Sequence, residues 1–330
     1  MTVELPSECR YLISRQGGVL ACSQAAEYGL DPEWLKSRLR YGDWQRLQRG
    51  VYAAYTGRPS RESELWAALL RCGNDAVLSH YTAAERHGLL KGQSQSIHVA
   101  VPERVDPARY RKIPGVIVHR SDAIVATGHP AITPRCTRIE DTVLDILKIT
   151  RGFDAKYNWV CAAIGDRRTT AERILARLAE RERYPRRTEV QLMLGFADEG
   201  IMSWLELQWV NGVERPHALP AAKRQVRVAQ ETGNKYLDNL YEDYHLCVEL
   251  DGQAAHKSEQ SRDKKRDRWN LVRGKIVTMR FETKDLRDAE HQCQAAAEVA
   301  HFLSDHREFD QGEPIGRPCS PACPVGRPIS

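Results

Sequence analysis

The sequence has no long hydrophobic run. Its 330 residues contain no uninterrupted apolar stretch of the roughly 18 residues that a membrane-spanning helix needs. We therefore expect no membrane span and no membrane partner. The first 14 residues include Glu4 and Glu8 and lack the apolar segment of a secretory signal. These absences predict a cytoplasmic protein.

The chain also lacks the cysteine pattern of a disulfide-stabilised protein. Its nine cysteines are odd in number, are scattered along the chain, and mostly lie inside apolar patterns. This usage is typical of reduced, buried thiols. Cys319 and Cys323 are separated by three intervening residues. Two cysteines cannot complete a zinc site, so we interpret them as incidental. Residues 306–330 are rich in proline and glycine and are predicted to be a disordered tail.

The net charge is small. It is +5, and residues 167–187 alone, with eight arginines and three glutamates, account for an excess of five positive charges. Within the predicted helical linker 151–195, Arg173, Arg177 and Arg181 share one helix face at a spacing of four residues. Two interpretations stay open: a solvated helix face between domains, or a helix that contacts DNA phosphates.

The middle segment, residues 57–150, has no catalytic constellation and no histidine pair at metal-ligand spacing. His80, His87, His98 and His119 are interpreted as ordinary structural or surface residues. The patterns predict a mixed α/β segment. Helices are expected over 60–72, 76–89 and 141–149, the last with a capping box at 137–140, and strands over 96–101 and 115–119.

Residues 1–56 have the layout of a winged helix-turn-helix. Helices are predicted over 7–15, over 24–28 after Ser23, and over 32–41, where Asp31 and Pro32 form a cap. A short hairpin follows around Gly50. Such a module places its second helix and its wing on DNA. The predicted DNA-binding residues of this module are Lys36, Ser37, Arg40, Arg46 and Arg49.

Residues 196–305 are predicted to be a separate α/β domain of helix, three strands, helix, strand and helix. The informative stretch is 235–252, which we interpret as two strands joined at Glu242 and Asp243, with Tyr241 opposite Tyr244. Side chains alternate between the faces of a strand. One face is then apolar, and the other gathers acidic residues of adjacent strands. The polar face holds Asp238, Cys247, Glu249 and Asp251.

Clustered carboxylates repel each other unless a cation lies between them. Oxygen ligands favour a hard divalent cation, Mg²⁺ or Mn²⁺. Such an ion can activate water and stabilise the charge that develops on a phosphate. The alternative is that these acids only face solvent beside a turn.

Further polar residues extend the pattern. Glu206 is a candidate catalytic acid on the first helix of the domain, and it equally fits a capping box with Ser203. His256 follows the strand, and a helix predicted over 258–274 places Asp263, Arg266 and Asp267 on one face. Arg280 ends the next strand.

This order of residues carries a resemblance. Residues 201–288, with Asp238, Glu249-x-Asp251-Gly252, His256 and Asp263-x-x-Arg266-Asp267, resemble the endonuclease-like domain of unknown function 559. That family is related to very-short-patch repair endonucleases and the PD-(D/E)XK superfamily. The resemblance implies a restriction-endonuclease-like α/β fold with metal ligands Asp238 and Glu249 and a catalytic contribution from His256. It departs at Asp251, where the superfamily usually has lysine.

A second resemblance covers residues 7–150, which are similar to the AbiEi-type antitoxin family of toxin–antitoxin systems. The residues that carry it are Gly18-Val-Leu-Ala-Cys-Ser-Gln-Ala, Leu47-x-Arg49-Gly50-Val51-Tyr52 and Leu78-Ser79-His80-x-x-Ala83-Ala84. The resemblance implies a winged helix that binds DNA and represses its own promoter, and a toxin or other protein as a partner.

Two functional hypotheses follow. In the first, a DNA-binding protein hydrolyses DNA phosphodiester bonds with Mg²⁺ or Mn²⁺, using Asp238, Glu249, Asp251, His256 and Glu206. In the second, the protein is a non-catalytic DNA-binding regulator or antitoxin. The oligomeric state and the recognised DNA do not follow from the sequence.

Overall fold

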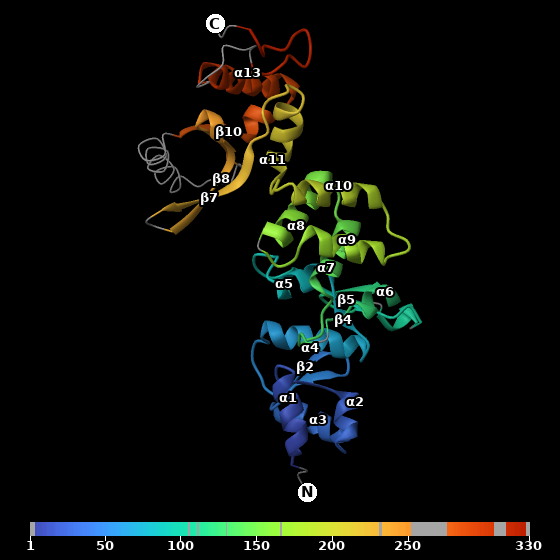
Figure 1. Ribbon diagram of the computed structural model, residues 1–330. Coiled ribbons are helices and arrows are strands. Elements are labelled where there is room, and N and C mark those ends of the chain that lie inside the picture. The colour runs from blue at the N-terminus through green and yellow to red at the C-terminus, as the bar shows by residue number, and fades with distance from the viewer. Residues whose placement is uncertain are drawn as a thin grey trace. The chain divides into compact units, whose positions relative to one another are not determined.

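The computed structural model describes residues 4–104, 106–110, 112–129, 131–165, 167–230, 233–251, 276–306 and 315–327 (Figure 1). It combines helices with three small sheets, so the predicted mixed α/β class is confirmed at this level. The chain divides into two compact units, Met1–Gln191 and Leu192–Ser330. Among the described helices, none is long and apolar enough to cross a membrane.

The first part of the N-terminal unit is a small helical module with a three-stranded sheet. Its elements are α1 (Ser7–Arg15), β1 (Val19–Ala21), α2 (Cys22–Glu27), α3 (Pro32–Tyr41), β2 (Gln45–Gln48) and β3 (Val51–Ala53), and the strand order is β1-β3-β2. The helices at 7–15 and 32–41 and the hairpin are confirmed. Asp31 caps α3 because its carboxylate accepts a hydrogen bond from the Trp34 N–H at 2.7 Å.

The structure differs from the sequence analysis at two places in this module. Strand β1 was not predicted; its residues Val19, Leu20 and Ala21 pair antiparallel with β3. Helix α2 begins at Cys22 and not after Ser23. The Gln24 side chain accepts a hydrogen bond from the Ala21 N–H at 3.1 Å, which fixes the earlier start.

A second sheet follows in the order β4-β5-β6. Its elements are α4 (Arg61–Cys72), β4 (Val77–Leu78), α5 (His80–Arg86), β5 (Ile97–Val101), a 3-10 turn (Pro107–Tyr110), β6 (Val116–Arg120) and α6 (Asp122–Ala126). The helix predicted over 76–89 is therefore wrong in its first turn. Val77 and Leu78 instead pair with Ala100 and Val99 of β5, which buries both side chains.

Four helices end this region: α7 (Ile139–Ile149), α8 (Phe153–Gly165), α9 (Ala171–Ala179) and α10 (Arg187–Asp198). Tyr184 and Pro185 lie between α9 and α10. The residue that precedes α7 is Arg138, not Thr137, because the Thr137 hydroxyl is engaged with the Thr142 hydroxyl at 2.6 Å.

The C-terminal unit is built around a four-stranded sheet. Its elements are α11 (Trp204–Trp209), a π-helical turn (Val210–Glu214), β7 (Lys223–Gln230), β8 (Gly233–Tyr241), a 3-10 turn (Glu242–Tyr244), β9 (Leu246–Asp251), β10 (Val277–Glu282), a second 3-10 turn (Thr283–Leu286) and α13 (Ala289–Asp305). The strand order is β10-β9-β8-β7, with β10 parallel to β9 and the other pairs antiparallel. The helix predicted over 258–274 lies outside the described residues.

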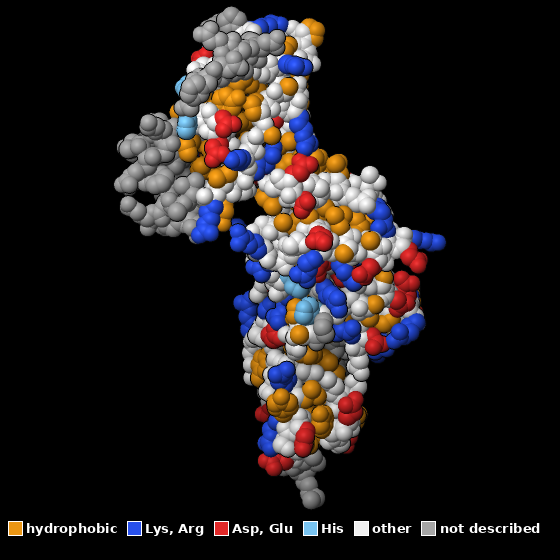
Figure 2. All heavy atoms as spheres, in the orientation of Figure 1, with side chains coloured by type: hydrophobic (Ala, Val, Ile, Leu, Met, Phe, Trp, Pro, Cys, Tyr) orange, Lys and Arg blue, Asp and Glu red, His pale blue; other side chains and the backbone are white. Residues whose placement is uncertain are grey.

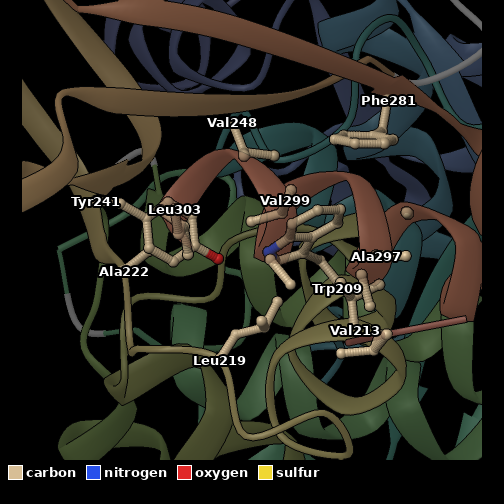
Figure 3. Packing of buried hydrophobic residues seen from close by; sticks show 14 of the residues in the cluster. Trp209, Val213, Leu219, Ala222, Tyr241, Val248, Phe281, Ala297, Val299 and Leu303 are labelled. Atoms are coloured by element: carbon tan, nitrogen blue, oxygen red, sulfur yellow. The ribbon is translucent and has the colours of Figure 1, made fainter. Parts of the chain in front are cut away.

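The core of this unit fills the space between the sheet and α13. Figure 3 shows side chains of the sheet (Val248, Phe281) and of α13 (Val299) around the Trp209 indole, whose ring centre is 4.9 Å from that of Phe281. Residues of segment 315–327 belong to the same core: Ile315, Cys323 and Val325. Part of the tail that was predicted to be disordered over 306–330 thus contributes these three buried side chains to the core.

Candidate functional site

The hairpin formed by β8 and β9 differs from the prediction in its register. Tyr241 pairs with Leu246, not with Tyr244. The connection is longer than expected because residues Glu242–Tyr244 form a 3-10 turn and His245 adopts a left-handed conformation with φ of 51°. The shift amounts to two residues. Since side chains alternate with period two, the predicted acidic face is preserved.

Asp238 lies where the two strands separate. The pairing of β8 with β9 runs from Tyr241 to Asn239. Beyond it, the Asp238 carboxylate accepts a hydrogen bond from the Leu250 N–H at 3.2 Å. Burial raises the pKa of Asp238, the charge of Asp251 raises it further, and the bond from Leu250 opposes the shift. The Asp238 carboxylate is thus half-buried beside the point where the two central strands separate.

Glu249 is 4% exposed and lies on β9 opposite Arg280 of β10. The Arg280 Nη1 atom is 4.0 Å from Glu249 Oε2 and 2.9 Å from Asp251 Oδ2. The Cys247 thiol is 3.8 Å from Glu249 Oε1. Asp251, which stands where the resembled superfamily has lysine, is therefore paired with an arginine that the neighbouring strand supplies.

Glu206 lies at the capped start of α11, and its carboxylate is buried. The Ser203 hydroxyl caps α11 by accepting from the Glu206 N–H at 3.0 Å, and the Glu206 carboxylate accepts from the Met202 N–H at 2.8 Å. Burial raises the pKa of Glu206 to about 7, and the charge of Asp238 contributes to the shift. The carboxyl group thus supports the helix start and also lies in the electrostatic field of Asp238.

Gln225 joins these acids and was missed in the sequence. Its amide donates to Glu206 Oε1 at 3.4 Å, and its hydrogen bond to Asp238 lowers the pKa of that carboxyl group. It lies on β7 with a left-handed φ of 51°, within a strand that pairs with β8. A glutamine in a polar strand carries no sequence signal for such a position. The pairing of β7 with β8 places it there.

The oxygen donors of Asp238 and Glu249 suit Mg²⁺ in kind. Two sets of His, Cys, Asp and Glu in the described part of the chain have all ligand atoms within 4.8 Å of one another, and neither set contains these acids. The acids therefore do not form a closed cage. They fit the usual protein contribution to Mg²⁺, which is one or two carboxylates, with water and phosphate oxygens completing the shell.

The sequence also predicted His256 as a catalytic residue and a helical signature of Asp263, Arg266 and Asp267. All four residues lie outside the described part of the chain.

The candidate DNA-binding residues of α3 and the hairpin lie on the surface, with one exception. Arg40, Arg46 and Arg49 are exposed. Lys36 is exposed too, and its ammonium group lies 2.6 Å from Glu33. Ser37 is half-buried, and its hydroxyl donates to the Trp34 carbonyl at 2.7 Å, so this group is already engaged within α3.

Arg173 and Arg177 of α9, and Arg181 just after its end, form ion pairs with acids of α7 and so do not make a free positive face. Arg177 and Arg181 both pair with Asp141 of α7, at 3.0 and 2.9 Å, and Arg181 also pairs with Asp145 at 2.6 Å. Arg173 is exposed and pairs with Glu140 at 2.9 Å. On the face shown in Figure 2, Lys and Arg side chains alternate with Asp and Glu over this unit.

Three histidines that the sequence left apart meet in the N-terminal unit. The ring centres of His80 and His119 are 3.7 Å apart with nearly parallel planes, and His98 Nδ1 is 3.0 Å from His119 Nε2. Burial lowers the pKa of His80 to about 2 and that of His119 to about 4, so both are neutral at physiological pH. Because the His80 and His119 rings are stacked, their nitrogen lone pairs lie in two parallel planes and do not point toward one metal ion. This arrangement is typical of packed side chains.

Comparison with models of known protein families and with curated proteins gives no match. The functional interpretation rests on the geometry of the acidic cluster.

Proposed function

We propose that the protein binds DNA and that its C-terminal unit hydrolyses phosphodiester bonds with a divalent cation. The observation that carries this proposal is the position of Asp238 where β8 and β9 separate. Its carboxylate accepts a hydrogen bond from the N–H of Leu250, directly after Glu249, and Glu206 lies within electrostatic reach. Buried carboxylates are costly unless a cation or a proton compensates them. Their position beside the point where the two central strands of the sheet separate fits a site that takes up a cation together with a phosphate.

Each residue of the cluster has a role in this proposal. Asp238 and Glu249 hold Mg²⁺ or Mn²⁺, which when bound lowers the pKa of a coordinated water and neutralises charge on the phosphate. Glu206 exchanges a proton near neutral pH, because its pKa of about 7 matches that task. Gln225 orients Glu206 and Asp238. Arg280 neutralises Asp251 and offers a guanidinium to a phosphate oxygen.

The N-terminal unit supports the DNA-binding half of the proposal. Helix α3 follows α2 across a short turn, and the hairpin of β2 and β3 follows α3, which is the chain order of a winged helix-turn-helix. Arg40 on α3 and Arg46 and Arg49 on the hairpin are exposed. We propose that these residues contact the DNA backbone.

The test is cleavage of supercoiled plasmid by the full-length chain with Mg²⁺ or Mn²⁺, comparing wild type with Asp238→Asn and Glu249→Gln. Loss of a metal ligand removes several kcal/mol of stabilisation of the transition state, so cleavage falls by roughly 100-fold or more. The matched control is Glu242→Gln, an exposed acid in the turn between the same strands that pairs with Lys223. Equal cleavage by wild type and Asp238→Asn would rule out the site.

A second function, a non-catalytic DNA-binding regulator, is favoured by the ion pair between Arg280 and Asp251. Asp251 stands at the position of the usual lysine and is paired with Arg280. This ion pair is what we expect of a domain that has kept the fold of a nuclease and lost its activity. In that case gel-shift measurements show salt-dependent DNA binding, while no metal supports cleavage. Absence of DNA binding at low salt excludes this function.

A further inference from the structure

Four residues with sulfur or nitrogen ligand atoms meet in the C-terminal unit. None of them belongs to the acidic cluster. They are His217, which follows the π-helical turn, Cys293 on α13, and Cys319 and Cys323 in segment 315–327. One ligand atom of each lies within 4.8 Å of the others. The sequence separates His217 from Cys323 by more than 100 residues, so the fold itself brings the set together.

The separations fit the edges of a zinc tetrahedron. His217 Nε2 is 3.4 Å from Cys293 Sγ, and Cys293 Sγ is 3.4 Å from Cys319 Sγ. Zinc bonds of about 2.3 Å to sulfur and 2.0–2.1 Å to nitrogen give tetrahedral edges of roughly 3.5–3.8 Å. A disulfide would place its sulfur atoms about 2.05 Å apart. The spacing is therefore that of co-ligands and not that of a bonded pair.

The histidine is oriented as a metal ligand. Its Nδ1 atom is 2.8 Å from the Val213 carbonyl oxygen. A carbonyl accepts only, so Nδ1 carries the proton and the lone pair of Nε2 faces the sulfur atoms. Zinc-binding histidines characteristically use their second ring nitrogen in this way. His217 is 1% exposed, so this geometry is held by the surrounding core.

The backbone around the cysteines is also fixed in place. The Arg317 N–H donates to the His217 carbonyl at 2.7 Å, and the Cys323 N–H donates to the Ser320 carbonyl at 3.0 Å. The second bond closes a turn over residues 320–323, which holds Cys323 close to the preceding Cys319. Their spacing of three intervening residues lies within the range of zinc-binding cysteine pairs. A metal here would tie segment 315–327 to α13.

We propose that His217, Cys293, Cys319 and Cys323 bind one structural zinc ion. Four protein ligands close the tetrahedron and leave no position for water or substrate, which distinguishes a structural from a catalytic site. Thiolate ligands select zinc over the Mg²⁺ expected at carboxylates. The site is independent of the proposed nuclease function, since it would stabilise the unit in an active or an inactive protein. The interpretation of the Cys319–Cys323 pattern as incidental is thereby replaced.

The test is the metal content of the full-length chain, purified without chelating resin or chelators. We expect about one zinc ion per chain. Cys319→Ser combined with Cys323→Ser loses it, whereas Cys22→Ser, which removes an exposed thiol outside the set, keeps it. In wild type, replacement by Co²⁺ gives the intense visible absorption of a tetrahedral site with sulfur ligands, and this result does not depend on how the variants fold.

Two results would overturn the proposal. One is wild-type protein with far less than one zinc ion per chain and no cobalt spectrum. The other is a non-reducing peptide map that reveals a disulfide between Cys293 and Cys319 in freshly purified protein. Loss of zinc in the double serine variant with unchanged zinc in Cys22→Ser supports the site.

Discussion

The two units contain two clusters of buried acids that are compensated in different ways. In the N-terminal unit, Asp141 and Asp145 are fully buried and pair with Arg177 of α9 and with Arg181, which follows that helix. In the C-terminal unit, Glu206 and Asp238 accept hydrogen bonds from backbone N–H groups and are linked by Gln225. An acid matched by an arginine is a structural element, whereas acids whose partners are backbone N–H groups and an amide can still take up a cation or a proton.

The largest expected effect breaks the first cluster. Asp141→Ala leaves Arg177 and Arg181 partly buried without their shared carboxylate, so it lowers the free energy of unfolding by about 3–5 kcal/mol. Denaturant unfolding followed by circular dichroism measures the change. The control is Glu33→Ala, whose exposed pair with Lys36 contributes at most about 1 kcal/mol. Similar losses in both variants would contradict a structural role for the cluster.

The second prediction concerns the proton on Glu206. Its pKa is about 7 in the folded protein against an ordinary 4.5, so between these pH values the folded state holds a proton that the unfolded state lacks. Stability therefore falls as pH rises from 4.5 to 7. Glu206→Gln removes this loss and stabilises the unit at pH 8 by up to about 3 kcal/mol, with no difference near pH 4.

Thermal unfolding of the wild type and Glu206→Gln across this pH range measures the effect. A constant difference between the two proteins at every pH would show that the carboxyl group does not titrate as proposed.

The third prediction distinguishes a cation site from a merely strained acid pair. Mg²⁺ at a few times its dissociation constant stabilises the wild type by about 1 kcal/mol at pH 8 through mass action. Asp238→Asn abolishes this gain because one ligand loses its charge. Thermal shift with and without Mg²⁺ measures it, and Glu242→Gln should respond like the wild type. An equal gain in Asp238→Asn places the ion elsewhere.

The smallest effect compares exposed with paired arginines. Arg40→Ala and Arg46→Ala should each reduce the slope of log affinity for DNA against log salt by about 1, because each removes one phosphate contact. Fluorescence anisotropy with a labelled duplex measures the slope. Arg10→Ala, an exposed arginine on α1 outside the predicted interface, serves as the control. If the slope is unchanged in both variants, α3 and the hairpin do not contact DNA.

Local signals predicted much of the fold. The cap formed by Asp31 and Pro32 set the start of α3, and Ser60 set that of α4, because these interactions span three residues of chain. Strand β4 at 77–78 was missed, since its pairing partner lies on β5, about 20 residues away. The register of the hairpin at 238–251 was wrong because a left-handed His245 lengthens the turn, which no residue type there demands.

The candidate site shows the same division. Alternation along a strand is a property of the extended backbone, so the sequence by itself determined that Cys247, Glu249 and Asp251 share a face. Asp238 of the next strand shares it because the register differs from the prediction by an even number of residues. Tertiary structure alone decided which charges are compensated. Arg177 and Arg181 meet Asp141 across two helices, Arg280 meets Asp251 across a parallel pair, and His217 meets Cys293, Cys319 and Cys323 across the core. Such contacts depend on how the helices and strands pack against one another, and residue spacing along the chain does not encode this packing.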